Sequence, residues 1–201
     1  GTILSFTSEF FLTTDNMVSV LRQVSTNMYL ALGMTLVIIL GGIDLSVGSI
    51  VAMCGTLTVG LIVTNGLPIW FSIAFCLLLG TCCGFLNGVI VARFRVPAFI
   101  VTLAMMNMAK GVAYIYSGGR STRIMNAGFN AIGTGQLFGF LPFPIVYMII
   151  LVAIFAVLLN KTKFGTYVFA VGGNREAAHY SGVPVKKVEI AVYTLMGFLA
   201  A

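Results

Sequence analysis

The sequence contains very few charged residues. Aspartate, glutamate, lysine and arginine make up 8% of the 201 residues and hydrophobic residues 59%, whereas soluble domains carry about 25% charged residues. We therefore expect an integral membrane protein rather than a soluble one. The net charge of +6 would suit nucleic acid in a soluble chain. Here the basic residues lie at the ends of apolar segments, as orientation signals do, so no nucleic-acid partner is expected.

Residue types that commonly perform chemistry are also scarce. The chain has one histidine and five carboxylates, which leaves little material for acid–base or nucleophilic catalysis. The absence of any Gly-Lys dipeptide excludes a Walker A phosphate loop, and no His-Glu-x-x-His or Gly-x-Ser-x-Gly pattern occurs. We therefore expect neither an enzyme nor an ATPase. No disulfide framework or metal site is predicted, because the cysteines lie inside apolar runs: Cys54, Cys76, Cys82 and Cys83.

Several apolar segments approach the roughly 17 to 25 residues that a helix needs to cross a membrane. They cover residues 24–40, 49–64, 67–92, 97–117, 143–160 and a last segment that begins near Val188, and residues 3–12 resemble the end of an earlier span. The sequence thus predicts an all-α, polytopic transmembrane helix bundle that forms a single domain over residues 1–201. Because the chain ends at Ala201 inside an apolar run, we expect further C-terminal helices in the complete protein.

The basic residues predict how the bundle is oriented, because lysine and arginine favour cytoplasmic loops. If the loop after residue 92 is cytoplasmic, the alternation of spans places seven basic residues there: Arg93, Arg95, Lys161, Lys163, Arg175, Lys186 and Lys187. Arg22, Arg120 and Arg123 then lie outside. The glycine-rich loop 118–142 is also external, and its composition allows either packing against the outer membrane face or a mobile loop.

Residues 172–184 form a polar segment between two apolar ones. Asn174 suits the N-cap of a helix, and Glu176 lies where the helix dipole favours an anion. Gly182 suits a left-handed stop, and Pro184 cannot continue the helix. We predict a short cytoplasmic helix over 174–181 that docks on another protein, with His179 as a contact residue rather than a proton relay.

Three glycines of the segment 67–92 recur at every fourth position, at Gly80, Gly84 and Gly88. They share one helix face, which favours close packing against another membrane helix over a direct role in transport. Asn87 lies beside them. Its amide must find a polar partner in the hydrocarbon region, so it either ties helices together or faces a wet path.

The segment from Gly41 to Ser49 reads Gly-Gly-Ile-Asp-Leu-Ser-Val-Gly-Ser, in which paired glycines end one helix and Asp44 or Ser46 caps the next. Two interpretations remain open. It is either a helix break in, or at the edge of, the membrane, of the kind that forms polar sites in transporters, or a tight cytoplasmic turn with Asp44 as its cap.

The span 97–117 contains a second polar pair, Asn107 and Lys110, about one turn apart. Lys110 either extends toward the membrane surface or counters a buried carbonyl. We take five residues as candidates for a polar translocation path: Asp44, Ser46, Asn87, Asn107 and Lys110.

Several of these segments together resemble a known family. Residues 176–182, Glu-Ala-Ala-His-Tyr-Ser-Gly, match the Glu-Ala-Ala-x-x-x-Gly core of the loop by which permease subunits of bacterial ABC importers engage their ATPases. The chain also resembles the ribose, xylose and galactose type of permease, in order and spacing, at residues 41–49, 97–103, 110–111, 117–119 and 170–178. The resemblance extends from about residue 10 to the end. Lys110 and Thr166 stand where arginine is common in that family.

The resemblance implies a homodimeric permease of the bacterial inner membrane that works with a separate ATPase and an extracytoplasmic sugar-binding protein. ATP and Mg²⁺ would bind the ATPase, and this chain would bind no cofactor. The residues implied in coupling to the ATPase are Gly172, Gly173, Asn174, Arg175, Glu176, Ala177, Ala178, Gly182 and Pro184. The sugar stays open among ribose, xylose, galactose and a furanone-type signalling derivative such as autoinducer-2.

Two other functions fit the sequence. An ion-coupled secondary transporter or channel would use Asp44 or Lys110 as its coupling residue and would transport without an ATPase. A membrane anchor would bind a cytoplasmic partner through the polar helix and would move no solute.

Overall fold

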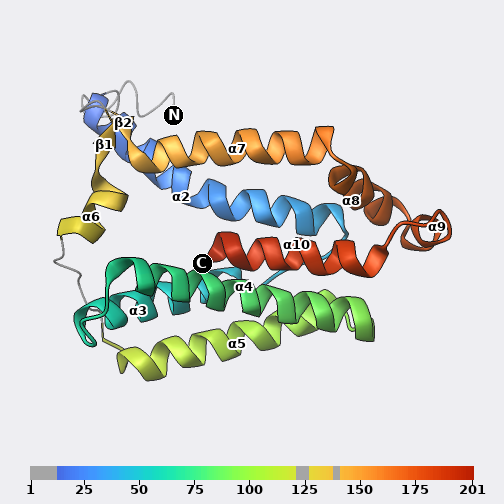
Figure 1. Cartoon of the computed structure of the whole chain (residues 1–201), viewed down its shortest axis with the longest axis horizontal. Helices are drawn as coiled ribbons and strands as arrows, with labels where there is room; N and C mark the ends of the chain where they lie inside the picture. Colours follow the sequence, from blue (N-terminus) through green and yellow to red (C-terminus); the bar gives the residue numbers. More distant parts are fainter. Residues whose placement is uncertain (1–12, 121–126, 138–140) are drawn as a thin grey trace, which may run out of the picture.

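The computed structural model describes residues 13–120, 127–137 and 141–201, and it consists almost entirely of α-helices (Figure 1). The predicted span end at residues 3–12 lies outside the described residues. The six predicted spans from residue 24 onward correspond to α2 (Thr14–Ile39), α3 (Val47–Val63), α4 (Ile69–Phe94), α5 (Ala98–Ser117), α7 (Phe143–Lys161) and α10 (Val185–Ala200). The prediction of an all-α bundle is confirmed.

The apolar segments of the sequence predicted the positions of the helices better than the residues at which the helices begin and end. Helix α2 begins at Thr14 and not at Val24, because hydropathy marks the membrane-buried part of a helix, whereas its hydrogen bonds continue through polar residues. Among the described helices, α4, α5 and α7 are long and apolar enough to cross a membrane. Helix α3 has 17 residues, about 25 Å at ~1.5 Å per residue, which is less than a hydrocarbon core of about 30 Å.

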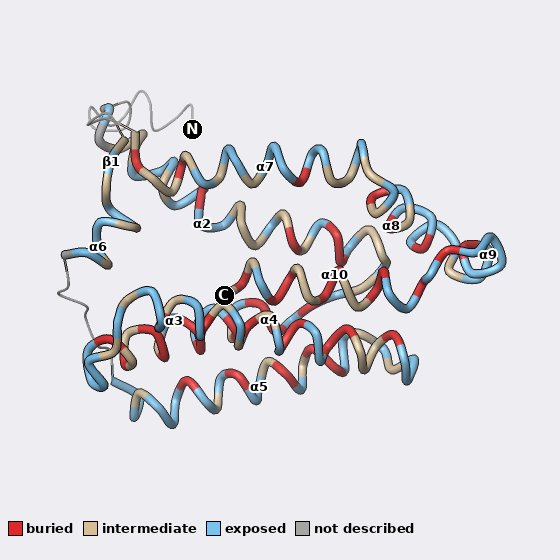
Figure 2. Tube along the Cα trace, in the orientation of Figure 1, coloured by how far each residue is buried: buried red, intermediate tan, exposed pale blue. Residues whose placement is uncertain are grey.

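Helix α10 forms the centre of the bundle. It packs mainly against α4 and α2, while α5 packs against α3 and α7 packs against α2. Figure 2 shows buried turns concentrated on α10 and α4, whereas α7 is largely exposed along its length. The outer faces of α4, α5 and α7 display large apolar side chains such as Trp70, Ile115 and Ile154, as expected of helices that face lipid.

The contact between α4 and α10 depends on glycine. A Cβ atom added to Gly84 would lie 2.9 Å from Gly197 Cα of α10, and one added to Gly88 would lie 2.8 Å from Ile190 Cα. A Cβ added to Gly80 would lie 2.9 Å from the carbonyl oxygen of Gly197. The two backbones therefore meet with no side chain between them, which is the packing that the four-residue spacing favours.

The two ends of the bundle differ in charge and structure. Helix α4 ends, α5 begins, α7 ends and α10 begins at one end, so the seven basic residues predicted to be cytoplasmic gather there (Figure 1). Arg95, just after α4, has a φ of 56°, in the left-handed region that non-glycine residues rarely adopt. At the opposite end the predicted external loop contains α6 (Ala127–Thr134) and an antiparallel pair, β1 (Gln136–Leu137) and β2 (Leu141–Pro142).

The glycine contact predicts a sharp difference between two substitutions. Gly84→Leu should lower the midpoint of thermal unfolding in detergent, because the new side chain collides with the α10 backbone, and such overpacking costs about 1–3 kcal/mol or more. Gly55→Leu on α3 is the matched control, since a Cβ there meets nothing within 4 Å. Equal midpoints for the two variants would contradict the close approach of α4 and α10.

Candidate functional site

The connection between α2 and α3, residues 40–46, runs back into the bundle from the end of α2 (Figure 1). We call it the α2–α3 break. Gly41, with a φ of 76°, turns the chain, and the amide of Gly42 donates to the carbonyl of Val37. The chain then continues without helical structure to Ser46 and contacts α4 and α5. The interpretation as a broken helix inside the bundle is therefore correct, and the tight cytoplasmic turn is not found.

Three of the five predicted path residues meet at this break. Asp44 is 3% exposed, and Ser46 and Asn87 are fully buried. Asp44 Oδ1 accepts hydrogen bonds from the amide of Ser46 at 2.8 Å and from its hydroxyl at 2.6 Å. Asn87 Nδ2 donates to Ser46 Oγ at 3.1 Å. This chain of hydrogen bonds ties the break to α4.

The predicted cap of α3 is wrong. Ser46 occupies the N-cap position, but α3 has no side-chain cap. Ser46 has φ −79° and ψ −15°, an α-helical conformation, whereas a capping residue is usually extended. Asp44 lies two residues before Ser46 and accepts from it instead, in the local pattern that aspartate often forms in turns.

Sequence reasoning missed Thr102, a buried residue of α5. The amide of Leu45 donates to Thr102 Oγ1 at 3.2 Å, and the same oxygen lies 3.1 Å from the carbonyl oxygen of Ile43 and 2.8 Å from that of Ala98. A threonine in an apolar helix usually bonds only to its own helix. The sequence therefore gave no signal that this one also holds the backbone of the break.

Asn107 and Lys110 lie apart from this network. Both are exposed on α5, and Asn107 Nδ2 donates to the carbonyl of Leu103 in its own helix at 3.0 Å. Within the described part of the chain Lys110 makes no hydrogen bond or ion pair, so it does not counter a buried carbonyl. The structure thus separates the five candidates into a buried group of three and an exposed pair.

The second group of candidate residues lies at the basic end. Here α8 (Lys163–Gly173) and α9 (Arg175–Tyr180) project beyond the ends of α2 and α7 (Figure 1). The sequence did not predict α8. Its Gly172 lies directly against the carbonyl of Ile39 at the end of α2, so this residue permits the packing of α8 on the bundle. Gly173 ends the helix, and a Cβ added there would meet nothing.

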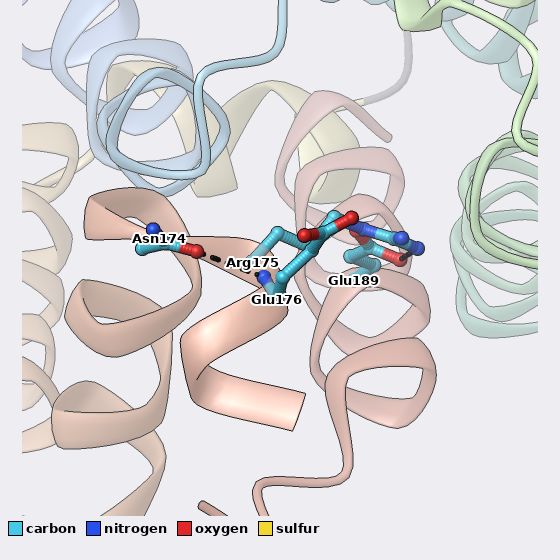
Figure 3. A network of polar contacts seen from close by, with 4 residues as sticks. All are labelled: Asn174, Arg175, Glu176 and Glu189. Carbon is cyan, nitrogen blue, oxygen red and sulfur yellow. Dashed lines mark hydrogen bonds and ion pairs between the residues drawn. The ribbon is translucent and has the colours of Figure 1, made fainter. Parts of the chain in front are cut away.

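Asn174 ends α8 and begins α9. Its Oδ1 accepts hydrogen bonds from the amides of Glu176 at 3.0 Å and Ala177 at 2.9 Å (Figure 3), which satisfies two otherwise unpaired amides. At the other end Gly182 has a φ of 83°, and its amide donates to the carbonyl of His179. The cap and the left-handed stop are both present, and Pro184 directly precedes α10.

Helix α9 exposes most of its surface. Glu176, Ala177 and His179 are exposed, and Tyr180 is 88% exposed. Ala178 is buried and belongs to the apolar cluster that includes Val183, Val185 and Val188. One small apolar residue therefore fixes the inner side of α9, while the outer side is free to contact a partner.

An ion pair also attaches α9 to α10. Arg175 Nε donates to Glu189 Oε1 at 2.6 Å, and Arg175 Nη2 donates to Glu189 Oε2 at 3.1 Å (Figure 3). These hydrogen bonds raise the pKa of Arg175 above its ordinary value. Sequence reasoning placed Arg175 in the site but missed Glu189, an acidic residue near the start of an apolar helix.

A cavity of about 630 Å³ opens beside α9. Four of its lining residues are basic, Arg95, Arg175, Lys186 and Lys187, and one, Glu176, is acidic. This end of the molecule therefore combines a capped, projecting helix with a basic hollow and one exposed carboxylate. It suits a partner protein that places acidic side chains opposite the hollow and a basic side chain opposite Glu176.

Comparisons with known proteins find similar chains among bacterial permeases. The chain is 40% identical to the ribose import permease protein RbsC of Haemophilus influenzae over 99% of its length and 62% of the relative. It is 41% identical to RbsC of Escherichia coli K12, covering 99% and 63% of the two chains. It is also 40% identical to the L-arabinose ABC transporter permease protein AraH of Azospirillum brasilense, covering 98% and 57%. The chain thus spans about three-fifths of these relatives.

No solved structure shows significant similarity. Residues 16–201 match the family described as branched-chain amino acid transport system / permease component. This match includes every described helix from α3 to α10 and nearly all of α2. The chain therefore belongs to this permease family, whose members are multi-pass proteins of the membrane.

Proposed function

We propose that this chain is the membrane-spanning permease part of an ATP-driven sugar importer, which works as a homodimer with a separate ATPase and an extracytoplasmic sugar-binding protein. The observation that carries the proposal is α9, a six-residue helix that is capped at its start, stopped by a left-handed glycine and exposed at the basic end. The names of the relatives, ribose import and L-arabinose ABC permeases, support a pentose or related monosaccharide as substrate.

The contacts of α9 divide the proposed coupling residues into two groups. Asn174, Ala178 and Gly182 shape the helix and seat it on the bundle. Glu176 and Ala177, with His179 and Tyr180, face outward and would contact the ATPase. Closure of the ATPase around ATP and Mg²⁺ would then move a rigid helix, and the bundle would switch access between its two sides.

The exposed pair on α5 fits the translocation path better than the buried group. A polar side chain on the outside of a membrane-spanning helix needs water or a polar partner. Asn107 and Lys110 meet this need if their face of α5 lines a wet passage between two permease copies. Asp44, Ser46 and Asn87 instead hold the α2–α3 break in place. The ion-coupled alternative is not favoured, since the relatives are named as import and ABC transporter permeases.

The decisive experiment reconstitutes the full-length permease with its ATPase and binding protein in liposomes. Uptake of labelled ribose or L-arabinose should require ATP on the side of the liposome membrane where the ATPase binds α9. It should also require the binding protein on the opposite side. Uptake driven by an ion gradient without the ATPase would contradict the proposal.

Docking through α9 predicts the behaviour of a double variant. Glu176→Arg with Gly182→Val should reduce co-purification with the ATPase at least tenfold, about 1.4 kcal/mol or more of binding free energy. The reason is that the first change reverses an exposed charge and the second forces valine into a left-handed conformation. Gly133→Val at the opposite end is the matched control, because a Cβ there meets nothing within 4 Å. Full binding by a correctly folded double variant would exclude α9 as the docking element.

The hydrogen bond between the amide of Leu45 and Thr102 predicts a second result. Thr102→Val keeps the side-chain shape but leaves the amide of Leu45 without its partner, which should lower the free energy of unfolding by about 1–3 kcal/mol. Uptake should fall with it. Thr35→Val on α2 is the matched control, since Thr35 is exposed and bonds only to its own helix. Thermal unfolding in detergent measures the difference, and indistinguishable midpoints would show that Thr102 does not hold the break.

A further inference from the structure

We propose that the Arg175–Glu189 ion pair, which we call the latch, transmits the movement of α9 to α10 and from there to the α2–α3 break. Both are positioning residues in this proposal, and the ATPase would not contact Glu189. The inference rests on the proposed function, because it takes α9 as the element that the ATPase moves.

The geometry of the latch fixes the relative orientation of the Arg175 and Glu189 side chains as well as their separation. Two parallel hydrogen bonds join the guanidinium fork to both carboxylate oxygens (Figure 3), and such two-point pairs resist rotation as well as separation. The Glu189 side chain is 10% exposed and that of Arg175 38%, so the carboxylate is held inside the protein. Within the described part of the chain this is the only ion pair.

The latch matters because α9 has few other attachments. Ala178 is its only buried residue, and a methyl group provides little area for transmitting force. Sliding of a small apolar contact costs little, whereas separating a two-point ion pair costs more in a partly buried site. A displacement of Arg175 should therefore move Glu189 with it.

Helix α10 leads from the latch to the break. Tyr193 lies four residues after Glu189 and so on the same helix face, and it is almost fully buried. Its hydroxyl lies so close to Gly42 that a Cβ atom there would collide with it, so a side chain of α10 touches the backbone of the break. A cavity of about 300 Å³ adjoins this contact, lined among others by Glu189, Tyr193 and Gly41, which leaves space for small movements.

A second route runs through α4. The backbones of α4 and α10 meet at Gly84 and Gly197, so the two helices are expected to move together. Asn87 on α4 donates to Ser46 at the other end of the break. A movement that enters α10 at Glu189 thus reaches the break at both Gly42 and Ser46.

The experiment is a double-mutant cycle in the complete transporter, with permease, ATPase and binding protein in liposomes. Arg175→Ala and Glu189→Ala are compared with the double variant and with the charge swap Arg175→Glu/Glu189→Arg. Sugar uptake per ATP hydrolysed is measured together with ATPase co-purification. Lys161→Ala is the matched control, because it removes an exposed cation from the same end of the bundle.

We expect Glu189→Ala to bind the ATPase and hydrolyse ATP but to import less sugar per ATP, by about fivefold or more, the lower end of usual coupling between sites. Arg175→Ala should show the same loss of sugar imported per ATP. The double variant should be no worse than either single variant, and the swap should recover at least half of the loss. Unchanged uptake per ATP in the single variants, additive losses in the double variant, or a parallel loss of ATPase binding in Glu189→Ala would each overturn the proposal.

Two further measurements keep the proposal testable if alanine variants fold poorly or the transporter proves inactive. Arg175→Lys keeps the charge but reaches fewer carboxylate oxygens, so uptake per ATP should be intermediate, and a wild-type value would count against the latch. Amide hydrogen exchange in α9 of the full-length permease in detergent does not depend on transport. It should accelerate in Arg175→Ala but not in Lys161→Ala. Absence of ATP-driven uptake by the wild type would sink the proposed function alone, whereas unchanged exchange would sink the latch.

Discussion

The closeness of α4 and α10 is the constraint on which the rest of the structure depends. Their backbones touch at Gly84 and Gly197, so no side chain can adjust the distance between them. Because water does not drive helices together inside a membrane, contact of this kind is a main source of attraction there. Helix α10 then forms the surface on which α2 and the break are arranged, and it extends to the basic end, where it meets α9.

The α2–α3 break shows how the protein solves a problem that the membrane imposes. A chain that leaves the helical conformation inside lipid exposes amides and carbonyls that must be paired. Here the pairing comes from buried side chains on two neighbouring helices: Thr102 of α5 meets the backbone at Leu45, and Asn87 of α4 meets Ser46. These polar residues therefore serve the fold first. Under the proposed function, exposed polar residues such as Lys110 would meet the solute.

Local signals in the sequence were sufficient for some features and not for others. The cap at Asn174 and the stop at Gly182 depend on a few neighbouring residues, so their chemistry could be predicted directly. Helix α8 could not, because its glycines at 165, 172 and 173 are typical of loops, and the contact that seats the helix joins Gly172 to the distant backbone of Ile39. Glu189 was missed for a related reason: its partner is 14 residues away, and only the turn after α9 brings them together. Gly80, Gly84 and Gly88 lay between these cases. Their spacing indicated close packing against another helix, but it did not indicate that this helix is α10.

Arg95, the residue that follows α4, has a left-handed backbone conformation. A side chain in this conformation costs about 1 kcal/mol or more that glycine would avoid, and nothing in the turn itself requires an arginine. Arg95 lines both the cavity beside α9 and the smaller cavity beside the break. Arg95 thus combines a strained backbone with a permanent positive charge that borders both hollows at the basic end of the bundle.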